Sequence, residues 1–206
     1  MLKRRRQAGD TLIEVLFAVT VFSLVVVGSI SIMNQGANAS ERALEITLVR
    51  QQVDAQAESL RFLHDSYVSA YTSGASYTGP AAQWAAMLTS IIATNETSAT
   101  SFGSLSSTCP TPPKGSFIIN SNSATFLSGN SVSLVPASSY AQVDYTTNPV
   151  SAGGIWVEAV RAATSTDTTQ ANAGYIDFHI LACWPVAGST VPATIATIVR
   201  LYDPRG

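Results

Sequence analysis

One carboxylate in this sequence stands where a membrane-crossing helix would have to bury it. Glu14 comes directly before an uncharged apolar run at residues 15–33, and Thr11, Leu12 and Ile13 come directly before Glu14. An unpaired charge at that depth costs several kcal/mol, so the residue is expected to have a partner.

The two cysteines are the next residues that could do chemistry. Cys109 lies in a Pro-rich loop and Cys183 ends the clearest predicted strand. Two cysteines are too few for a four-thiolate zinc site, and this pair is too far apart for a redox dithiol turn. A disulfide in an exported domain is the simplest interpretation, with free thiols as the alternative. The bond would enclose a loop of about 75 residues, which is worth roughly 4 to 5 kcal/mol in the chain-entropy treatment.

Little in the sequence predicts catalysis. His64 lies on or beside the apolar stripe of a long helix, and His179 alternates with Asp177 on a strand, so both are interpreted as structural histidines. The sequence contains none of four common catalytic or nucleotide-binding motifs. These are the G-x-S-x-G motif of hydrolases, the G-x-G-x-x-G motif of dinucleotide-binding proteins, the P-loop, and the H-E-x-x-H motif of zinc proteases. The segment 164–173 holds a single acidic residue, Asp167, and is a poor metal candidate. The prediction is no enzyme, no metal and no cofactor.

Charge is sparse and unevenly placed. Charged residues make up 12% of the chain and hydrophobic residues 46%. Four of the eleven basic residues form the run Lys3 to Arg6, which leaves seven against thirteen acidic residues in the remainder. Such an acidic remainder excludes generic nucleic-acid binding, which needs clustered Lys and Arg.

The apolar run has the length of one membrane span. Its 19 residues form a helix of ~28 Å, close to the hydrocarbon thickness of a bilayer. The basic cluster precedes the span, so the positive-inside rule places the N-terminus in the cytoplasm and the residues after Met33 outside. The sequence therefore predicts a single-pass protein of the cytoplasmic membrane.

A second, amphipathic stretch continues the helix. Apolar residues recur every three or four positions, with a mean step of about 3.6, the helix period. The stripe is Ile46, Val49, Val53, Ala57, Leu60, Leu63, Tyr67 and Tyr71. A polar stripe of Asp54, Glu58, Arg61 and Asp65 follows another side, with Arg61 and Asp65 predicted to pair. Because no proline interrupts residues 11–71, we predict one nearly continuous helix over 11–67, with Gly28 as its weakest point.

The remaining residues predict a shorter helix and a sheet. Pro80 suits the first turn of a helix over 80–94, whose buried face would be Trp84, Leu88, Ile91 and Ile92. Strands are predicted at 116–120, 124–127, 131–135, 141–145, 154–163, 175–184 and 194–202. In 175–184, apolar residues at even positions alternate with Asp177 and His179, which is typical of a half-buried antiparallel strand.

The expected fold class is α+β. A long N-terminal helix, transmembrane in its first half, would pack its second half on a C-terminal antiparallel sheet. The expected divisions are a basic leader at 1–9, the transmembrane and assembly half of the helix at 10–33, its amphipathic half at 34–72, and an exported β-rich domain at 73–206.

The sequence GDTLIEV at residues 9–15 resembles the N-terminus of the type IV pilins and of the pseudopilins of type II secretion. Those proteins have a short basic leader, a glycine at the cut, and a Thr-Leu-Ile-Glu run that opens an apolar helix. The resemblance implies cleavage by a prepilin peptidase between Gly9 and Asp10, with methylation of the new terminal amine on Asp10. Glu14 would then pair with the terminal amine of a neighbouring subunit during assembly.

Two departures from that family bear on the interpretation. Asp10 stands where a phenylalanine is usual, and its carboxylate would compete with Glu14 for the amine, which puts methylation in doubt. The proline that breaks the helix in major pilins is absent. The first departure favours a minor subunit, and the second leaves Gly28 as the weakest point if the helix melts on assembly. The partners then implied are other pilin subunits, the prepilin peptidase and the inner-membrane assembly platform.

Several alternatives remain open. The span could be an ordinary signal anchor, with Glu14 at the headgroup level, or a secretory signal peptide with an A-x-A site at Ala37 to Ala39. The function we expect is a minor pilin or pseudopilin that initiates, caps or decorates a type IV pilus or pseudopilus, in a cell-surface or periplasmic filament. The rivals are a membrane-tethered binding module, such as an adhesin, that does not polymerise, and a secreted hydrolase beginning at Ser40.

Overall fold

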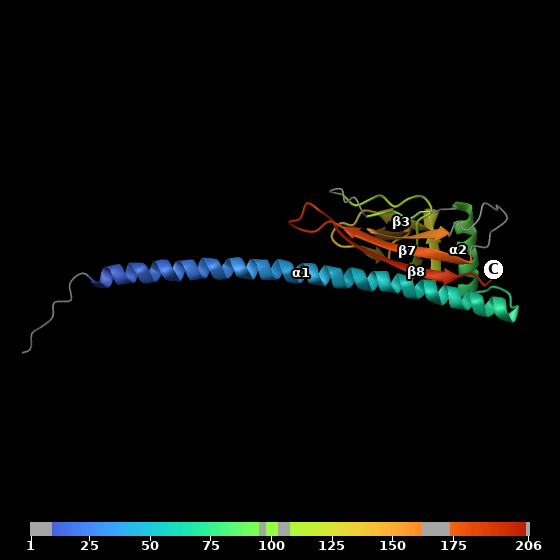
Figure 1. Cartoon of the computed structure of the whole chain (residues 1–206), viewed down its shortest axis with the longest axis horizontal. Coiled ribbons are helices and arrows are strands. Elements are labelled where there is room, and N and C mark those ends of the chain that lie inside the picture. The colour runs from blue at the N-terminus through green and yellow to red at the C-terminus, as the bar shows by residue number, and fades with distance from the viewer. Residues whose placement is uncertain (1–9, 95–97, 103–107, 162–173, 205–206) are drawn as a thin grey trace, which may run out of the picture. The chain divides into compact units, whose positions relative to one another are not determined.

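The computed structural model describes residues 10–94, 98–102, 108–161 and 174–204. Two compact units divide the chain, Met1–Leu44 and Glu45–Gly206, and helix α1 (Asp10–Ser73) passes through their boundary. The predicted α+β class is confirmed, since a long apolar helix precedes an antiparallel β-sheet domain (Figure 1). The expected leader 1–9 and the segment 164–173 with Asp167 lie outside the described residues.

Helix α1 begins and ends close to its predicted limits and is longer at its C-terminal end. It ends at Ser73 because Gly74 takes a left-handed conformation with φ +66°. The amide of Ala75 then donates to the carbonyl of Ala70 at 3.0 Å, and that of Gly74 donates to Tyr71 at 3.2 Å. These are the two hydrogen bonds of a Schellman C-cap, which favours glycine.

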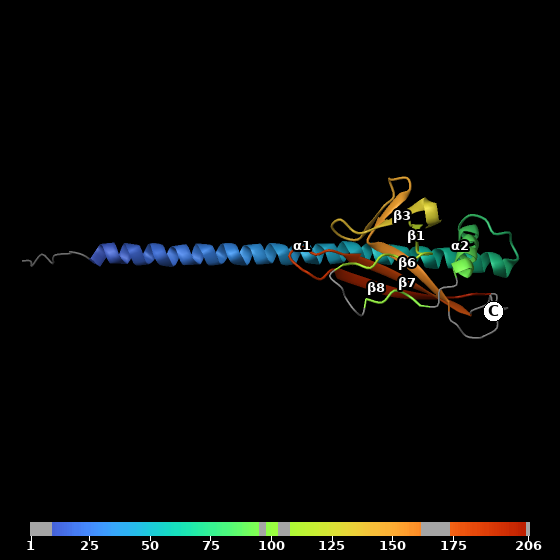
Figure 2. The same ribbon diagram turned by 90° about the horizontal axis from the view of Figure 1, so that it is seen from above.

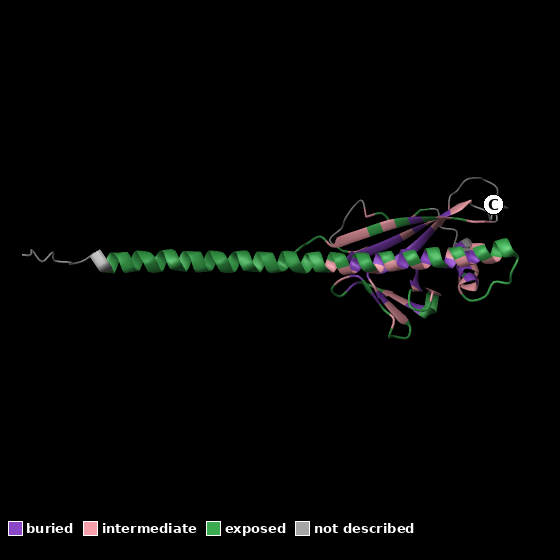
Figure 3. Cartoon of the chain, turned by 90° about the horizontal axis from the view of Figure 1, so that it is seen from below, coloured by how far each residue is buried: buried purple, intermediate pink, exposed green. Residues whose placement is uncertain are grey.

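The predicted apolar stripe is the buried face of α1 in the Glu45–Gly206 unit, as the alternating colours of Figure 3 show. Its buried members are Val49, Val53, Ala57, Leu60, Leu63 and Tyr67. The prediction was wrong at its two ends, because Ile46 and Tyr71 are each 41% exposed. The predicted pair of Arg61 with Asp65 is also wrong. Arg61 pairs instead with Glu58, one turn earlier, and Asp65 contacts His64.

Helix α2 (Pro80–Thr94) has the predicted bounds. It buries Trp84, Leu88 and Ile91 as expected, and also Met87, while the side chain of Ile92 lies outside the described residues. The side chain of Gln83 faces strand β2 and accepts a hydrogen bond from the amide of Phe126 at 3.1 Å. That bond satisfies an edge amide of the sheet.

Eight strands follow in the described part of the chain. They are β1 (Phe117–Asn120), β2 (Thr125–Ser128), β3 (Val132–Val135), β4 (Gln142–Asp144), β5 (Val150–Gly153), β6 (Ile155–Arg161), β7 (Tyr175–Trp184) and β8 (Ala193–Tyr202). Five form an antiparallel sheet in the order β2-β1-β6-β7-β8. The other three form a small sheet, β3-β5-β4, in which β3 and β5 are parallel. That parallel pair was not predicted. The sheet lies over the second half of α1 (Figure 2).

The strand expected at 154–163 is β6, and the strand directly before it, β5, was not predicted. Gly154 separates the two strands. This residue has φ +69°, and a Cβ there would lie 2.3 Å from the carbonyl oxygen of Cys183. Its carbonyl accepts from the amide of Cys183, and its amide donates to Val135, both at 2.8 Å. Gly154 therefore joins the two sheets at a point that no other residue type fits.

Strand β7 shows the predicted alternation. Ile176, Phe178 and Ile180 are buried, while Asp177 faces away from the core and accepts two hydrogen bonds from Arg200 of β8, both at 2.7 Å. Arg200 also lies 4.0 Å over the ring of Tyr175. The hydrogen bond from Arg200 holds the pKa of Asp177 below its ordinary value.

Candidate functional site: the N-terminal half of helix α1

The first half of α1 carries apolar side chains that the Met1–Leu44 unit does not cover. Within the described residues, α1 is the helix long and apolar enough to cross a membrane. Its most apolar window of 18 residues has a mean hydropathy of 2.5, and none of that window is buried. The exposed large side chains include Leu12, Ile13, Val15, Leu16, Phe17, Phe22, Leu24, Val25, Val27, Ile30, Ile32 and Met33. A helix apolar on every side requires lipid or other helices around it.

Three hydroxyl groups in this segment form hydrogen bonds within the helix. Thr20 donates to the carbonyl of Phe17 at 2.8 Å, Ser23 donates to Val19 at 2.7 Å, and Ser29 donates to Val25 at 2.8 Å. Lipid offers no hydrogen-bond partners, so every polar group in a span must find one inside the protein. The helix meets this requirement over these residues.

The motif residues open this helix. α1 begins at Asp10, and Leu12, Ile13 and Glu14 are all exposed in its first turns. Gly9 and the side chains of Asp10 and Thr11 lie outside the described residues. Glu14 makes no ion pair with any residue of the described chain. Its carboxylate is therefore available to a group from another molecule.

A buried glutamine fixes the second half of α1 to the sheet. Strand β1 leaves β6 after Phe117, so the backbone of Ile119 lacks a strand partner on that side. Gln56 fills the gap: its Oε1 accepts from the amide of Ile119 at 2.8 Å, and its Nε2 donates to the Ile119 carbonyl at 2.7 Å. Gln56 is fully buried. We did not predict this role, although a glutamine between Val53 and Ala57 on the buried side of an amphipathic helix was the signal for it.

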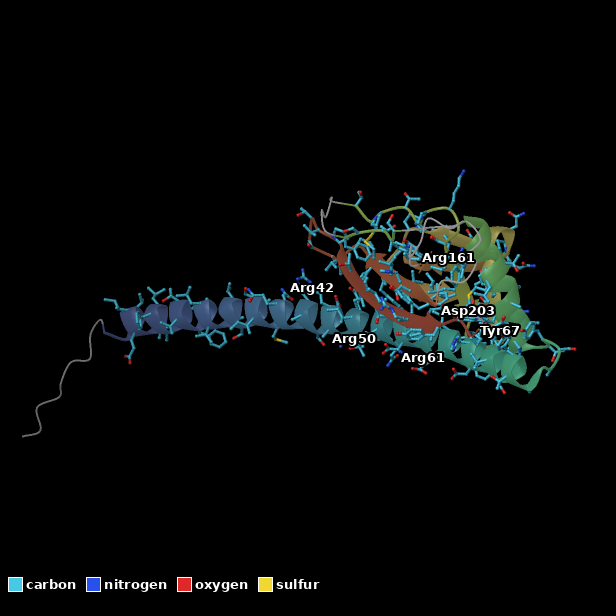
Figure 4. All side chains as sticks on the ribbon, turned by 45° about the vertical axis from the view of Figure 1, so that its right-hand side comes forward. Arg42, Arg50, Arg61, Tyr67, Arg161 and Asp203 are labelled. Atoms are coloured by element: carbon cyan, nitrogen blue, oxygen red, sulfur yellow. A yellow bond between two sulfur atoms is a disulfide. The ribbon has the colours of Figure 1, made fainter. Side chains whose placement is uncertain are left out.

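Two further polar residues of α1, His64 and Glu45, contact the rest of the Glu45–Gly206 unit. His64 contacts the carbonyl of Tyr202 through Nε2 at 2.8 Å and packs edge-on against Trp84. Glu45 accepts a hydrogen bond from the indole of Trp184 at 3.2 Å. Structural partners of this kind are what the sequence predicts for His64. Arg50 and Arg61 lie on the exposed side of this part of α1 (Figure 4).

The predicted disulfide joins Cys109 to Cys183. Cys183 is buried in a small cluster with Trp156 and Leu181, and Phe102 and Cys109 pack against it. This cluster lies on the face of the sheet opposite to the main core. The bond therefore holds the segment before β1 against that face.

Among the residues that the structure describes, no group of three or more His, Cys, Asp or Glu side chains is arranged to hold a metal ion. His179 lies on β7 opposite Glu158 of β6.

A comparison with known protein families finds a match at the N-terminus of the chain. Residues 4–30 match a family model described as the prokaryotic N-terminal methylation motif, which is the prepilin motif of type IV pilins and pseudopilins. No curated protein and no solved structure matches the chain. The motif supports a type IV pilin-like or pseudopilin protein, and it implies processing by a prepilin peptidase and assembly with other pilins.

Proposed function

We propose that the chain is a minor pilin or pseudopilin, a structural subunit that initiates, caps or decorates a type IV pilus or a type II secretion-like pseudopilus. The observation that carries this proposal is the coincidence of the methylation motif with an uncovered apolar helix. Such a helix can be held by a bilayer before assembly and by neighbouring helices afterwards. The β-domain would remain outside the membrane throughout.

The leader and its charges support a defined topology. Lys3, Arg4, Arg5 and Arg6 precede the span, and a cluster of that kind is retained in the cytoplasm. A peptidase acting on the cytoplasmic side would cut between Gly9 and Asp10 and leave a free amine at the start of α1. Methylation of Asp10 would keep that amine basic. The residues after the span would lie outside the cytoplasmic membrane.

Glu14 is the residue that we expect to direct assembly. The new amine of one subunit and the Glu14 carboxylate of the next would neutralise each other in an environment that solvates neither. Inner-membrane assembly proteins and other pilin subunits are the expected partners. Asp10, beside the amine, would weaken this pairing within a chain of identical subunits, which supports the role of a minor subunit.

Replacing Glu14 with alanine is expected to abolish incorporation into filaments. Truncating one member of a buried, hydrogen-bonded charge pair weakens association by about 2 to 5 kcal/mol, roughly thirtyfold or more in affinity. Sheared filaments should lack the E14A protein while the membrane fraction retains it, as measured by immunoblotting both fractions.

The matched control is Glu41→Ala, which removes an exposed glutamate of the same unit beyond the apolar run. E41A should enter filaments at the wild-type level. Normal incorporation of E14A would contradict the proposal. It would favour the second candidate, a tethered binding module that never polymerises.

A further inference from the structure

A cavity of about 300 Å³ lies in the Glu45–Gly206 unit. The last turn of α2, residues 98–100, the turn at 113–116 and strand β6 line it. Its volume is at the lower end of the range for small-molecule sites, roughly 300 to 1,000 Å³. It is separate from the exposed helix on which the proposed function depends.

A buried carboxylate forms part of the cavity wall. Glu158 is only 5% exposed. Its Oε1 accepts a hydrogen bond from the indole of Trp156 at 2.6 Å, and its Oε2 accepts one from the backbone amide of Thr100 at 2.7 Å. Both donors are neutral, one from strand β6 itself and one from residues 98–102. They fix the carboxylate in position and leave each oxygen able to accept a further bond.

No cation accompanies this carboxylate in the described part of the chain. Lys114 lines the same cavity and His179 lies opposite Glu158 on β7, yet neither forms an ion pair with it. A buried charge without a counter-charge is unfavourable, and structures normally supply a paired group. The described residues around the cavity therefore supply no positive group that pairs with Glu158.

A buried hydroxyl in the wall of the same cavity has no hydrogen-bond partner. Ser116 lines the cavity, is 6% exposed, and its Oγ makes no hydrogen bond within the described structure. Ser116 comes one residue before Phe117, which pairs with Val157, and Glu158 follows Val157. Ser116 directly precedes β1, Glu158 lies on β6, and both residues line the cavity. Buried polar atoms of this kind are usually satisfied, so an unsatisfied one indicates an absent partner.

We propose that the cavity binds a small organic molecule through a primary ammonium group. An ammonium carries three N–H donors and a full positive charge. It can donate to Glu158 and to Ser116 at once, which neutralises the first and satisfies the second. The aliphatic surfaces of Ile91, Pro113 and Ala159 would contact the carbon skeleton of the ligand.

The indole signals of the full-length protein test this proposal directly. The ¹⁵N-labelled protein in detergent micelles is titrated with n-butylammonium chloride, with n-butanol and sodium chloride as controls for shape and ionic strength. The Trp156 indole and the Thr100 amide should shift saturably, with a Kd of about 1 mM. The Trp184 indole, which donates to Glu45, should stay in place and serves as an internal control for ammonium binding at other carboxylates.

Variants identify the groups responsible. Glu158→Gln should weaken binding at least tenfold, and Ser116→Ala by roughly fivefold. Ser116→Ala should fold normally, because its hydroxyl has no partner to lose. Lys114→Gln should leave binding unchanged or strengthen it, since it removes a nearby like charge.

Three outcomes would overturn the proposal. The first is the absence of a saturable shift, and the second is an equal response to n-butanol. The third is a Trp156 indole signal that moves on Lys114→Gln alone, which would make Lys114 the occupant of the site.

Discussion

Loss of the Cys109–Cys183 disulfide is expected to lower the free energy of unfolding of the Glu45–Gly206 unit by about 4 to 5 kcal/mol. The bond joins residues 74 positions apart, so the oxidised chain loses much of the freedom that its unfolded state would otherwise have. Urea unfolding of the full-length protein, followed by tryptophan fluorescence, measures the effect. Trp84, Trp156 and Trp184 are all buried in this unit.

Two forms of the protein distinguish the effect of losing the disulfide bond from the effect of changing the cysteine side chains. Reduced wild-type protein and the double variant C109S/C183S should unfold at the same, lower urea midpoint. If the wild-type midpoint does not move on reduction, the disulfide does not contribute as proposed.

Replacing Gln56 with alanine is expected to lower the free energy of unfolding of the same unit by about 2 to 4 kcal/mol. The substitution leaves the amide of Ile119 buried without a partner, at about 1 to 3 kcal/mol. The carbonyl of Ile119 keeps only the longer hydrogen bond from the hydroxyl of Tyr145, at 3.4 Å. For a unit of this size the melting temperature should fall by on the order of 10 °C. Thermal unfolding followed by tryptophan fluorescence gives the value.

The matched control is Gln51→Ala on the exposed side of the same helix. That change should alter the melting temperature by no more than about 1 °C, as surface substitutions usually do. If Q56A and Q51A have the same melting temperature, the hydrogen bonds of Gln56 do not contribute to the packing of α1 on the sheet as proposed.

The sequence predicts best those elements whose signal is local. An apolar run without charges and a stripe at helical spacing are sufficient for α1, and strict alternation is sufficient for β7. The disulfide was predicted because only two cysteines exist. Gly79 and Pro80 mark the start of α2, and Gly74 marks the end of α1.

Features that depend on distant residues could not be read from the pattern. Gly154 divides β5 from β6 because the backbone of Cys183 approaches it, and that contact depends on the finished sheet. Gln56 meets Ile119 across 63 positions of sequence, and Glu158 meets Thr100 across 58. Arg61 had two acidic residues within one turn, Glu58 and Asp65, and the helix geometry favours the first.

The N-terminal residue and the intact mass of the protein extracted from membranes test the central proposal most directly. The account predicts a chain that begins at Asp10, lighter than the full chain by the nine residues of the leader. A protein that begins at Met1 was never processed, and one that begins at Ser40 was released by a signal peptidase. Either result would contradict the pilin interpretation.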